Sequence, residues 1–142
     1  MANRRDLQRA TALHEEGRRL YQCGSLGNFT AVLTLYDQAL ALDPDNEQIW
    51  YDKGNVFRMW ERLQLVGEDV RPRHQEAIAC YERAVALDPN YADAWGNMGV
   101  SYGLSGNHRE ALRCFNKALE IHPNDQQWLR MKALALQRLG DT

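Results

Sequence analysis

Apolar residues recur three or four positions apart along most of this chain, which is the spacing of one buried face of a helix. The stretches with this spacing cover residues 5–24, 28–42, 46–66, 73–87, 91–105, 108–121 and 125–139. Three of the stretches are followed by a proline, which cannot continue a helix. The pattern therefore predicts an all-α protein of about seven helices.

A short motif of aromatic, small and proline positions occurs three times with constant internal spacing. Its copies are Tyr36, Ala39 and Pro44, then Tyr81, Ala84 and Pro89, then Phe115, Ala118 and Pro123. The last two copies are 34 residues apart and the first two are 45 apart. The difference predicts an 11-residue insertion in the second unit, between residues 58 and 76. Repeats of this length, with two helices each, stack into an elongated solenoid.

Glycine recurs inside the first predicted helix of each unit, at Gly17, Gly54 and Gly99. Glycine within a helix costs about 1 kcal/mol relative to alanine, so a compensating contact is expected. We expect the three motif alanines to supply the opposing small surface of a close helix contact, with the aromatic residues beside it. The residues that follow the three prolines, Asp45, Asn90 and Asn124, are of types that favour helix N-caps.

These features resemble the tetratricopeptide repeat. The third unit fits that motif at almost every column, with Trp95, Gly99, Tyr102, Gly106, Ala111, Phe115, Ala118 and Pro123. The first unit is degenerate, because Leu13, Leu20 and Val32 replace the usual tryptophan, aromatic residue and alanine. The resemblance implies an α-solenoid of antiparallel helix pairs, a right-handed superhelix. We expect one domain over 1–142, with repeats at 10–45, 46–90 and 91–124 and a capping helix at 125–140.

The resemblance also implies that the first helices of successive units line a concave groove that binds a peptide or a partner protein. Periodicity then selects the groove residues, and Val100 and Leu104 fall among them. The candidate polar groove residues are Arg18, Tyr51, Asp52, Asn55, Arg58, Asn97 and Arg130.

Some members of that family hold the C-terminal carboxylate of a peptide with cations and two asparagines. The asparagine places fall on Asn55 and Asn97, but the basic places fall on Tyr51, Gln127 and Met131. Without cations the charge-assisted bonds are missing, so we expect no carboxylate clamp. Asn55 and Asn97 remain predicted to bind a peptide backbone.

The last predicted helix is apolar on more than one face. Its residues Leu129, Ala133 and Leu136 match the inward columns of the repeat. The remaining apolar positions, together with Trp60 in the insertion, are candidates for self-association: Trp60, Trp128, Met131, Leu134 and Ala135. A weak homodimer or a partner helix is expected to cover them. For Trp60, local packing on the following helix is the alternative.

Composition narrows the function classes. The chain is 44% hydrophobic and 25% charged with a net charge of −2, so it lacks the basic character of a nucleic-acid-binding protein. It shows no signal-peptide pattern, and no apolar run approaches the roughly 20 residues that span a membrane. Cys23, Cys80 and Cys114 are widely spaced and odd in number, which is typical of reduced thiols in a cytoplasmic protein.

Candidate chemistry is sparse. The sequence lacks a phosphate-binding glycine loop and a His-Glu-x-x-His motif, and its histidines are scattered. We therefore expect no enzyme, no metal and no cofactor. The sequence favours an interaction module that binds a protein or peptide partner. The alternatives are a small chaperone that holds a client segment, and an assembly unit that oligomerises through the last helix and the insertion.

Overall fold

The computed structural model describes residues 2–23, 28–63 and 71–140, and these ranges form helices and no strand. The helices are α1 (Arg4–Gln22), α2 (Phe29–Leu42), α3 (Glu47–Leu63), α4 (Arg71–Leu87), α5 (Ala92–Leu104), α6 (His108–Ile121) and α7 (Gln126–Gly140). The predicted all-α solenoid of antiparallel helix pairs is confirmed.

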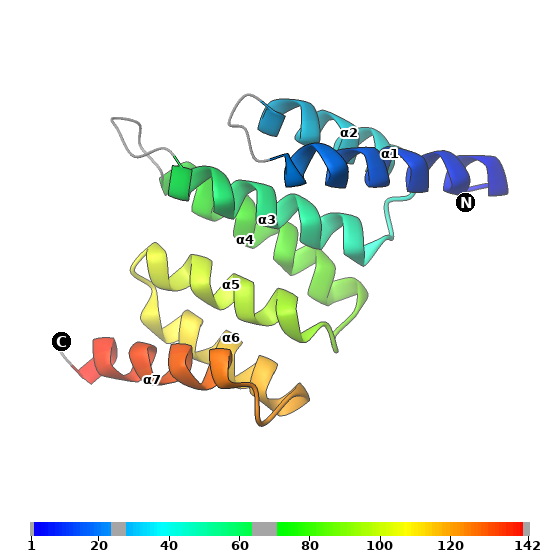
Figure 1. Cartoon of the computed structure of the whole chain (residues 1–142). Helices are drawn as coiled ribbons and strands as arrows, with labels where there is room; N and C mark the ends of the chain where they lie inside the picture. The colour runs from blue at the N-terminus through cyan, green and yellow to red at the C-terminus, as the bar shows by residue number, and fades with distance from the viewer. Residues whose placement is uncertain (1, 24–27, 64–70, 141–142) are drawn as a thin grey trace.

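The helices form two layers (Figure 1). Helices α1, α3, α5 and α7 are neighbours in one layer, which we call the first-helix layer, and α2, α4 and α6 form the second. Helices α3 and α5 each pack on the second helix of their own unit and on the second helix of the preceding unit, whereas α1 packs on α2 and α7 packs on α6. This double contact joins the units into one row.

An aromatic ring lies directly on the helix glycine of each unit. A Cβ added to Gly17, Gly54 or Gly99 would approach ring carbons of Tyr36, Tyr81 or Phe115 to 2.5, 2.6 and 2.6 Å, respectively. Real Cβ atoms do not come this close to other heavy atoms, so only glycine admits the ring. The expected close helix contact is present, but the group opposite the glycine is the ring rather than the motif alanine.

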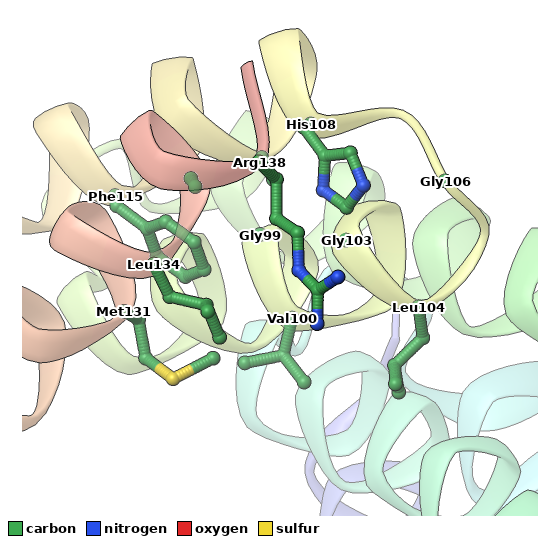
Figure 2. A pocket seen from close by; sticks show the side chains of 12 residues that line it. Gly99, Val100, Gly103, Leu104, Gly106, His108, Phe115, Met131, Leu134 and Arg138 are labelled. Atoms are coloured by element: carbon green, nitrogen blue, oxygen red, sulfur yellow. The ribbon is translucent and has the colours of Figure 1, made fainter. Parts of the chain in front are cut away.

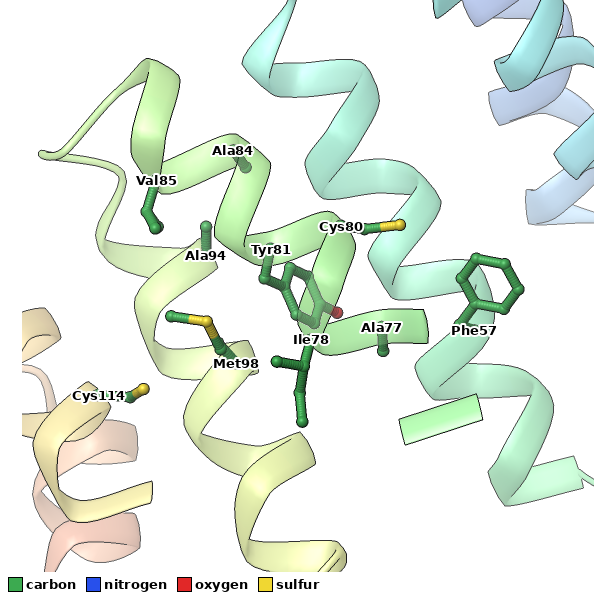
Figure 3. Close-up of a cluster of buried hydrophobic side chains, with 10 residues drawn as sticks. All are labelled: Phe57, Ala77, Ile78, Cys80, Tyr81, Ala84, Val85, Ala94, Met98 and Cys114. Atoms are coloured by element: carbon green, nitrogen blue, oxygen red, sulfur yellow. The ribbon is translucent and has the colours of Figure 1, made fainter. Parts of the chain in front are cut away.

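The buried core is continuous between units. Figure 3 shows the central cluster, in which Tyr81 of α4 lies between α3 and α5. Cys80, Met98 and Cys114 belong to the same cluster. The motif alanines Ala39, Ala84 and Ala118 are fully buried. Because their side chains are small, the two layers approach closely and the aromatic rings keep their space.

A tryptophan side chain forms a hydrogen bond with the linker before each of α3 and α5. Trp50 Nε1 donates to the carbonyl oxygen of Pro44 at 2.9 Å, and Trp95 Nε1 repeats this bond with Pro89 at 2.9 Å. The corresponding position of α7 is Leu129, which has no donor.

The predicted N-caps are wrong by one residue. Asn46, not Asp45, accepts from the Ile49 amide at 3.3 Å, and Asp125, not Asn124, accepts from the Gln127 amide at 2.9 Å. At α5 the cap position is Tyr91, whose side chain makes no capping bond. The linkers therefore continue one residue further before each helix begins.

The insertion is only partly described. Helix α3 is described as far as Leu63, so residues 64–66 of the predicted helix lie outside the described part, and α4 begins at Arg71, before the predicted start at residue 73. Pro72 thus lies in the first turn of α4 and not in the preceding linker. The first turn tolerates proline because the backbone N–H that proline lacks would have no partner within the helix there. Residues 64–70 and the side chain of Trp60 lie outside the described part, so both interpretations of Trp60 stay predictions.

The buried face of α7 differs from the one that the sequence predicted. Trp128 and Ala135, predicted to lie on a self-association surface, are buried at 2% and 4% exposure. Leu129 and Leu136, predicted to face inward, are 39% and 49% exposed. Leu129 and Leu136 hold the columns of Trp95 and Tyr102, and no second helix covers them within the described residues, whereas Trp128 packs in one cluster with residues of α6. Trp128 lies on Gly96 and stacks on Phe115 with ring centroids 6.2 Å apart.

The contact between Phe115 and Gly99 yields a stability prediction. Gly99→Ala places a Cβ 2.6 Å from a ring carbon, and we expect the free energy of unfolding to fall by about 1–3 kcal/mol despite the better helix propensity of alanine. Gly103→Ala, in the same helix, is the matched control, because its Cβ would meet only Ala111 at an ordinary 3.9 Å. Chemical denaturation of both variants measures the difference, and equal stabilities would contradict the packing described here.

Candidate functional site

Three polar side chains predicted to lie in the groove form one hydrogen-bonded network with Tyr81 of the core. The Asn97 side-chain amide donates to Asn55 Oδ1 at 3.0 Å and to Tyr51 Oη at 3.1 Å. The Tyr81 hydroxyl donates to the same Asn55 oxygen at 2.5 Å. Asn97 is buried at 8% exposure, so its donors link α5 to α3 rather than face a solvent-filled groove.

Burial controls the chemistry of the phenols in this network. Desolvation raises the pKa of Tyr81 far above its ordinary value, and the nearby Arg58 opposes that rise to a smaller extent. Desolvation also raises the pKa of Tyr51, which a hydrogen bond with Asn55 partly offsets. Both hydroxyls are neutral donors and acceptors at physiological pH, so they serve to position Asn55 and Asn97.

A second cluster surrounds the Asp52 carboxylate between α1 and α3. His14 Nε2 lies 2.6 Å from Asp52 Oδ2, and Arg18 Nε lies 3.5 Å from the same oxygen. Gln48 donates to the other carboxylate oxygen at 3.4 Å. Arg18 and Asp52, both predicted to bind a ligand, therefore bind each other and connect the first two units.

Of the two other predicted groove cations, Arg58 lies near Tyr81 of the amide network and Arg130 lies on α7. Arg58 is half-buried, and its Nε has no hydrogen-bond partner among the described residues. Arg130 is exposed, and its Nε donates to the Gln126 carbonyl of its own helix at 3.2 Å. The structure thus gathers Tyr51, Asn55 and Asn97 in one cluster but does not bring Arg130 to it.

The open concavity of the first-helix layer lies between α5 and α7. It is a pocket of about 430 Å³ with mostly apolar walls. Its floor is Ala111 and Phe115 of α6. Figure 2 shows the side chains on its two sides, which include Val100 and Leu104 from α5 and Met131, Leu134 and Arg138 from α7.

Small residues create the space for this pocket. Gly99 and Gly103 of α5 present no side chain to it, and Ala111 and Ala135 present only a methyl group. At the end of α5, Gly106 adopts a positive φ of 88°, and the Asn107 amide donates back to the Tyr102 carbonyl at 2.9 Å. This turn stops α5 sharply and allows α6 to begin beside the pocket.

Arg138 brings the formal positive charge to this pocket. Its side chain extends from α7 across the opening (Figure 2), and it forms no ion pair within the described residues. His108 contributes an imidazole at the start of α6. The chemistry of the pocket therefore suits an apolar group that carries a neighbouring negative charge.

Part of this pocket was predictable from the sequence. Val100 and Leu104 were assigned to the groove, Met131 to both the groove and self-association, Leu134 to self-association and Arg138 to no site. The signal was present in the spacing of Met131, Leu134 and Arg138, which are three and four residues apart and so share one helix face.

Two other features, a metal-binding cluster and a membrane-spanning helix, are absent from the described residues. No three His, Cys, Asp or Glu side chains in this part of the chain gather into a metal site. In the same ranges, no helix combines the length and the apolar character that crossing a membrane requires.

Comparisons with known families follow the repeat spacing. The model for the tetratricopeptide repeat matches residues 92–125, and a second model, described as a TPR repeat, matches residues 17–58 and 73–106. The second model alone spans more than half of the chain. The chain belongs to the tetratricopeptide repeat family. The gap between the two matches of the second model coincides with the insertion predicted from the repeat spacing.

Solved structures of the family share the fold. The first TPR of Spaghetti (RPAP3), solved with the HSP90 peptide SRMEEVD, has a TM-score of 0.80 at 21% identity, covering 94% of this chain and 95% of that one. The Arabidopsis OM64 TPR domain has a TM-score of 0.79 at 15% identity, with coverages of 93% and 98%.

The Sgt2 TPR domain from Aspergillus fumigatus has a TM-score of 0.76 at 19% identity, with coverages of 93% and 80%. A search of curated protein sequences finds no significant match. At these identities the structural likeness establishes the fold of this chain, a fold typical of modules that bind proteins or peptides.

The buried amide network yields a second prediction. Asn97→Ala removes both donors that join α5 to α3, and we expect the free energy of unfolding to fall by about 1–3 kcal/mol. The sequence predicted only a role in peptide binding for Asn97. The matched control is Asn116→Ala on α6, whose half-buried side chain makes no hydrogen bond within the described part. Equal changes in melting temperature for the two variants would show that Asn97 has no structural role.

The cysteines yield a prediction of pH-dependent reactivity. Desolvation raises the pKa of the Cys80 and Cys114 thiols to about 12, whereas Cys23 is exposed. At pH 8 the reactive thiolate of either buried cysteine is a fraction on the order of 10⁻⁴, so a disulfide reagent should modify only Cys23 in the folded chain. Denaturant should release all three thiols. Rapid modification of more than one thiol per folded chain would show that the core is open.

Proposed function

We propose that this chain is a non-catalytic interaction module that binds a segment of a partner protein on its first-helix layer. The pocket between α5 and α7 is the anchor of the bound segment. The single observation that carries this proposal is that pocket, because it is an apolar concavity of about 430 Å³ at the surface. Such concavities, with a few polar groups at the edge, are where proteins bind ligands.

The polar part of the layer has a supporting role in this proposal. The donors of Asn97 and the oxygen of Asn55 already bind each other, and the carboxylate of Asp52 is occupied by His14 and Arg18. These groups fix the spacing of α1, α3 and α5. A bound segment therefore gains its affinity mainly from apolar contact at α5 and α7, with polar contacts around it.

An acidic C-terminal tail fits this layer poorly. The SRMEEVD peptide bound to the Spaghetti TPR ends in an acidic residue and a carboxylate. Here the basic places that were compared with a carboxylate clamp hold Tyr51, Gln127 and Met131, and the asparagines are engaged in the network. The pocket instead favours an internal segment with a large apolar side chain and a carboxylate near Arg138.

The two alternatives derived from the sequence use the same surface differently. A small chaperone would hold many apolar client segments in the pocket, with little selectivity. A weak homodimer would cover Met131 and Leu134 with a second copy, although the buried Trp128 and Ala135 take no part. The sequence-based expectation of a cytoplasmic location accompanies all three functions.

Peptide selection tests the proposal. A library of random peptides displayed on phage is selected on the immobilised chain, and the enriched peptides are titrated against variants. Leu134→Glu introduces a carboxylate at the pocket wall, and we expect it to weaken binding at least about tenfold because an apolar contact becomes a buried charge.

Leu7→Glu is the matched control for this experiment. Leu7 on α1 is 40% exposed and Leu134 is 43% exposed, so both changes perturb the fold to a similar extent. Enriched peptides should bind the Leu7 variant as they bind the unaltered chain. Peptides that bind both variants equally would place the site elsewhere, and enriched peptides without a common apolar residue would favour the chaperone alternative.

A further inference from the structure

Helix α7 carries a second apolar face, separate from the pocket. Leu129, Ala133 and Leu136 are four and three residues apart, so they share one side of the helix. Leu129 is 39% exposed and Leu136 is 49% exposed. These residues lie on a different side of α7 from the buried Trp128, and we call them the outer face of α7.

The repeat shows what normally occupies this face. Leu129, Ala133 and Leu136 follow Trp95, Gly99 and Tyr102 by 34 residues each. In the third unit the second helix, α6, packs on this side of α5, and its Phe115 lies on Gly99. Within the described residues, no such helix packs on the outer face of α7.

The edge of α6 next to α7 is also partly uncovered. Leu40 and Val85 hold one column in the first two units and are buried at 7% and 8% exposure. Leu119 holds that column in α6 and is only half-buried. The outer face of α7 and the adjacent edge of α6 therefore form one surface of the shape that accepts a helix.

Charge indicates the kind of helix. On the wheel of α7, Lys132 and Arg130 flank the outer face on its two sides. Helix α7 contains no carboxylate, and neither cation has an ion pair in the described part of the chain. On the adjacent α6, Glu120 pairs with Lys117 at 3.7 Å. An acidic helix would satisfy the flanking cations, whereas two copies of α7 would bring like charges together.

Ala133 excludes helices like those of this chain. In each unit a Cβ at the glycine column would lie 2.5 to 2.6 Å from the ring of the second helix. Ala133 has that Cβ, so it rejects a ring at the same place. The second helices of another copy carry Tyr36, Tyr81 and Phe115 there and are excluded. The occupant must bring a small residue to Ala133.

We propose that the outer face of α7 binds an acidic amphipathic helix of a partner protein, with a small residue opposite Ala133. This surface is independent of the pocket that anchors the proposed peptide segment. A chain with both surfaces can hold two partners, or two segments of one partner, at the same time.

Three helix-stapled peptides based on α6 test the proposal. The acidic probe has the sequence of residues 108–121 with Phe115→Ala, Cys114→Ser, and Arg109, Arg113 and Lys117 changed to Glu. The ring probe differs only in keeping Phe115. The basic probe differs from the acidic one in keeping its cations and replacing Glu110 and Glu120 with Lys. Fluorescence anisotropy measures binding to the unaltered 142-residue chain.

The expected result is a specific order of affinities. The acidic probe should bind, and the basic and ring probes should each bind at least about tenfold more weakly. Ala133→Gly should restore binding of the ring probe, because it recreates the glycine column. Leu136→Glu should abolish binding of the acidic probe, whereas Leu134→Glu should leave it unchanged. That last pair separates this surface from the pocket.

Several results would overturn the proposal. One is no anisotropy change with the acidic probe up to millimolar concentration. Another is equal binding of the acidic and basic probes. A third is an affinity of the ring probe that Ala133→Gly does not change. Light scattering that shows a dimer abolished by Leu136→Glu would assign the face to a second copy instead. None of these results bears on the pocket, which the phage-selected peptides test through Leu134.

Discussion

The architecture depends on an aromatic ring that lies on a helix glycine. The contact recurs with Tyr36 on Gly17, Tyr81 on Gly54 and Phe115 on Gly99. Glycine weakens a helix, but here the loss is offset because a whole ring is buried against bare backbone. The contact sets how closely the two helices of a unit approach. Trp128 extends the same principle between units, because it lies on Gly96 and stacks on Phe115.

The functional surfaces follow from this packing. Close approach of the units brings polar side chains of neighbouring first helices within hydrogen-bond distance, so Asn55 and Asn97 bind each other. Towards α7 no such network fills the layer, and Gly99 and Gly103 leave the pocket open. The outer face of α7 arises because α7 repeats the residue positions of a first helix, while no second helix packs on it within the described residues.

Much of the fold was predictable from the sequence, because the period and the motif columns are local patterns. The helices and the glycine columns follow from spacing, and the antiparallel pairing follows from the resemblance to the repeat family. The predicted N-caps were displaced by one residue because both Asn46 and Asp45 are capping types, and only the backbone path selects between them. The buried face of α7 was missed because Trp128 and Leu129 are equally apolar, and burial depends on which neighbouring helix is present. Networks such as that of Asn97, Asn55 and Tyr81 depend on distances between units, which spacing alone does not give.

The most direct test of the central claim is a double-mutant cycle on the first unit, with unfolding free energies measured for Gly17→Ala, Tyr36→Leu and the double variant. If the ring rests on the glycine, Gly17→Ala destabilises the chain with Tyr36 present but becomes neutral or stabilising once Tyr36→Leu removes the ring. The coupling between the two changes should then be about 1 kcal/mol or more. Additive effects of the two substitutions would contradict the account.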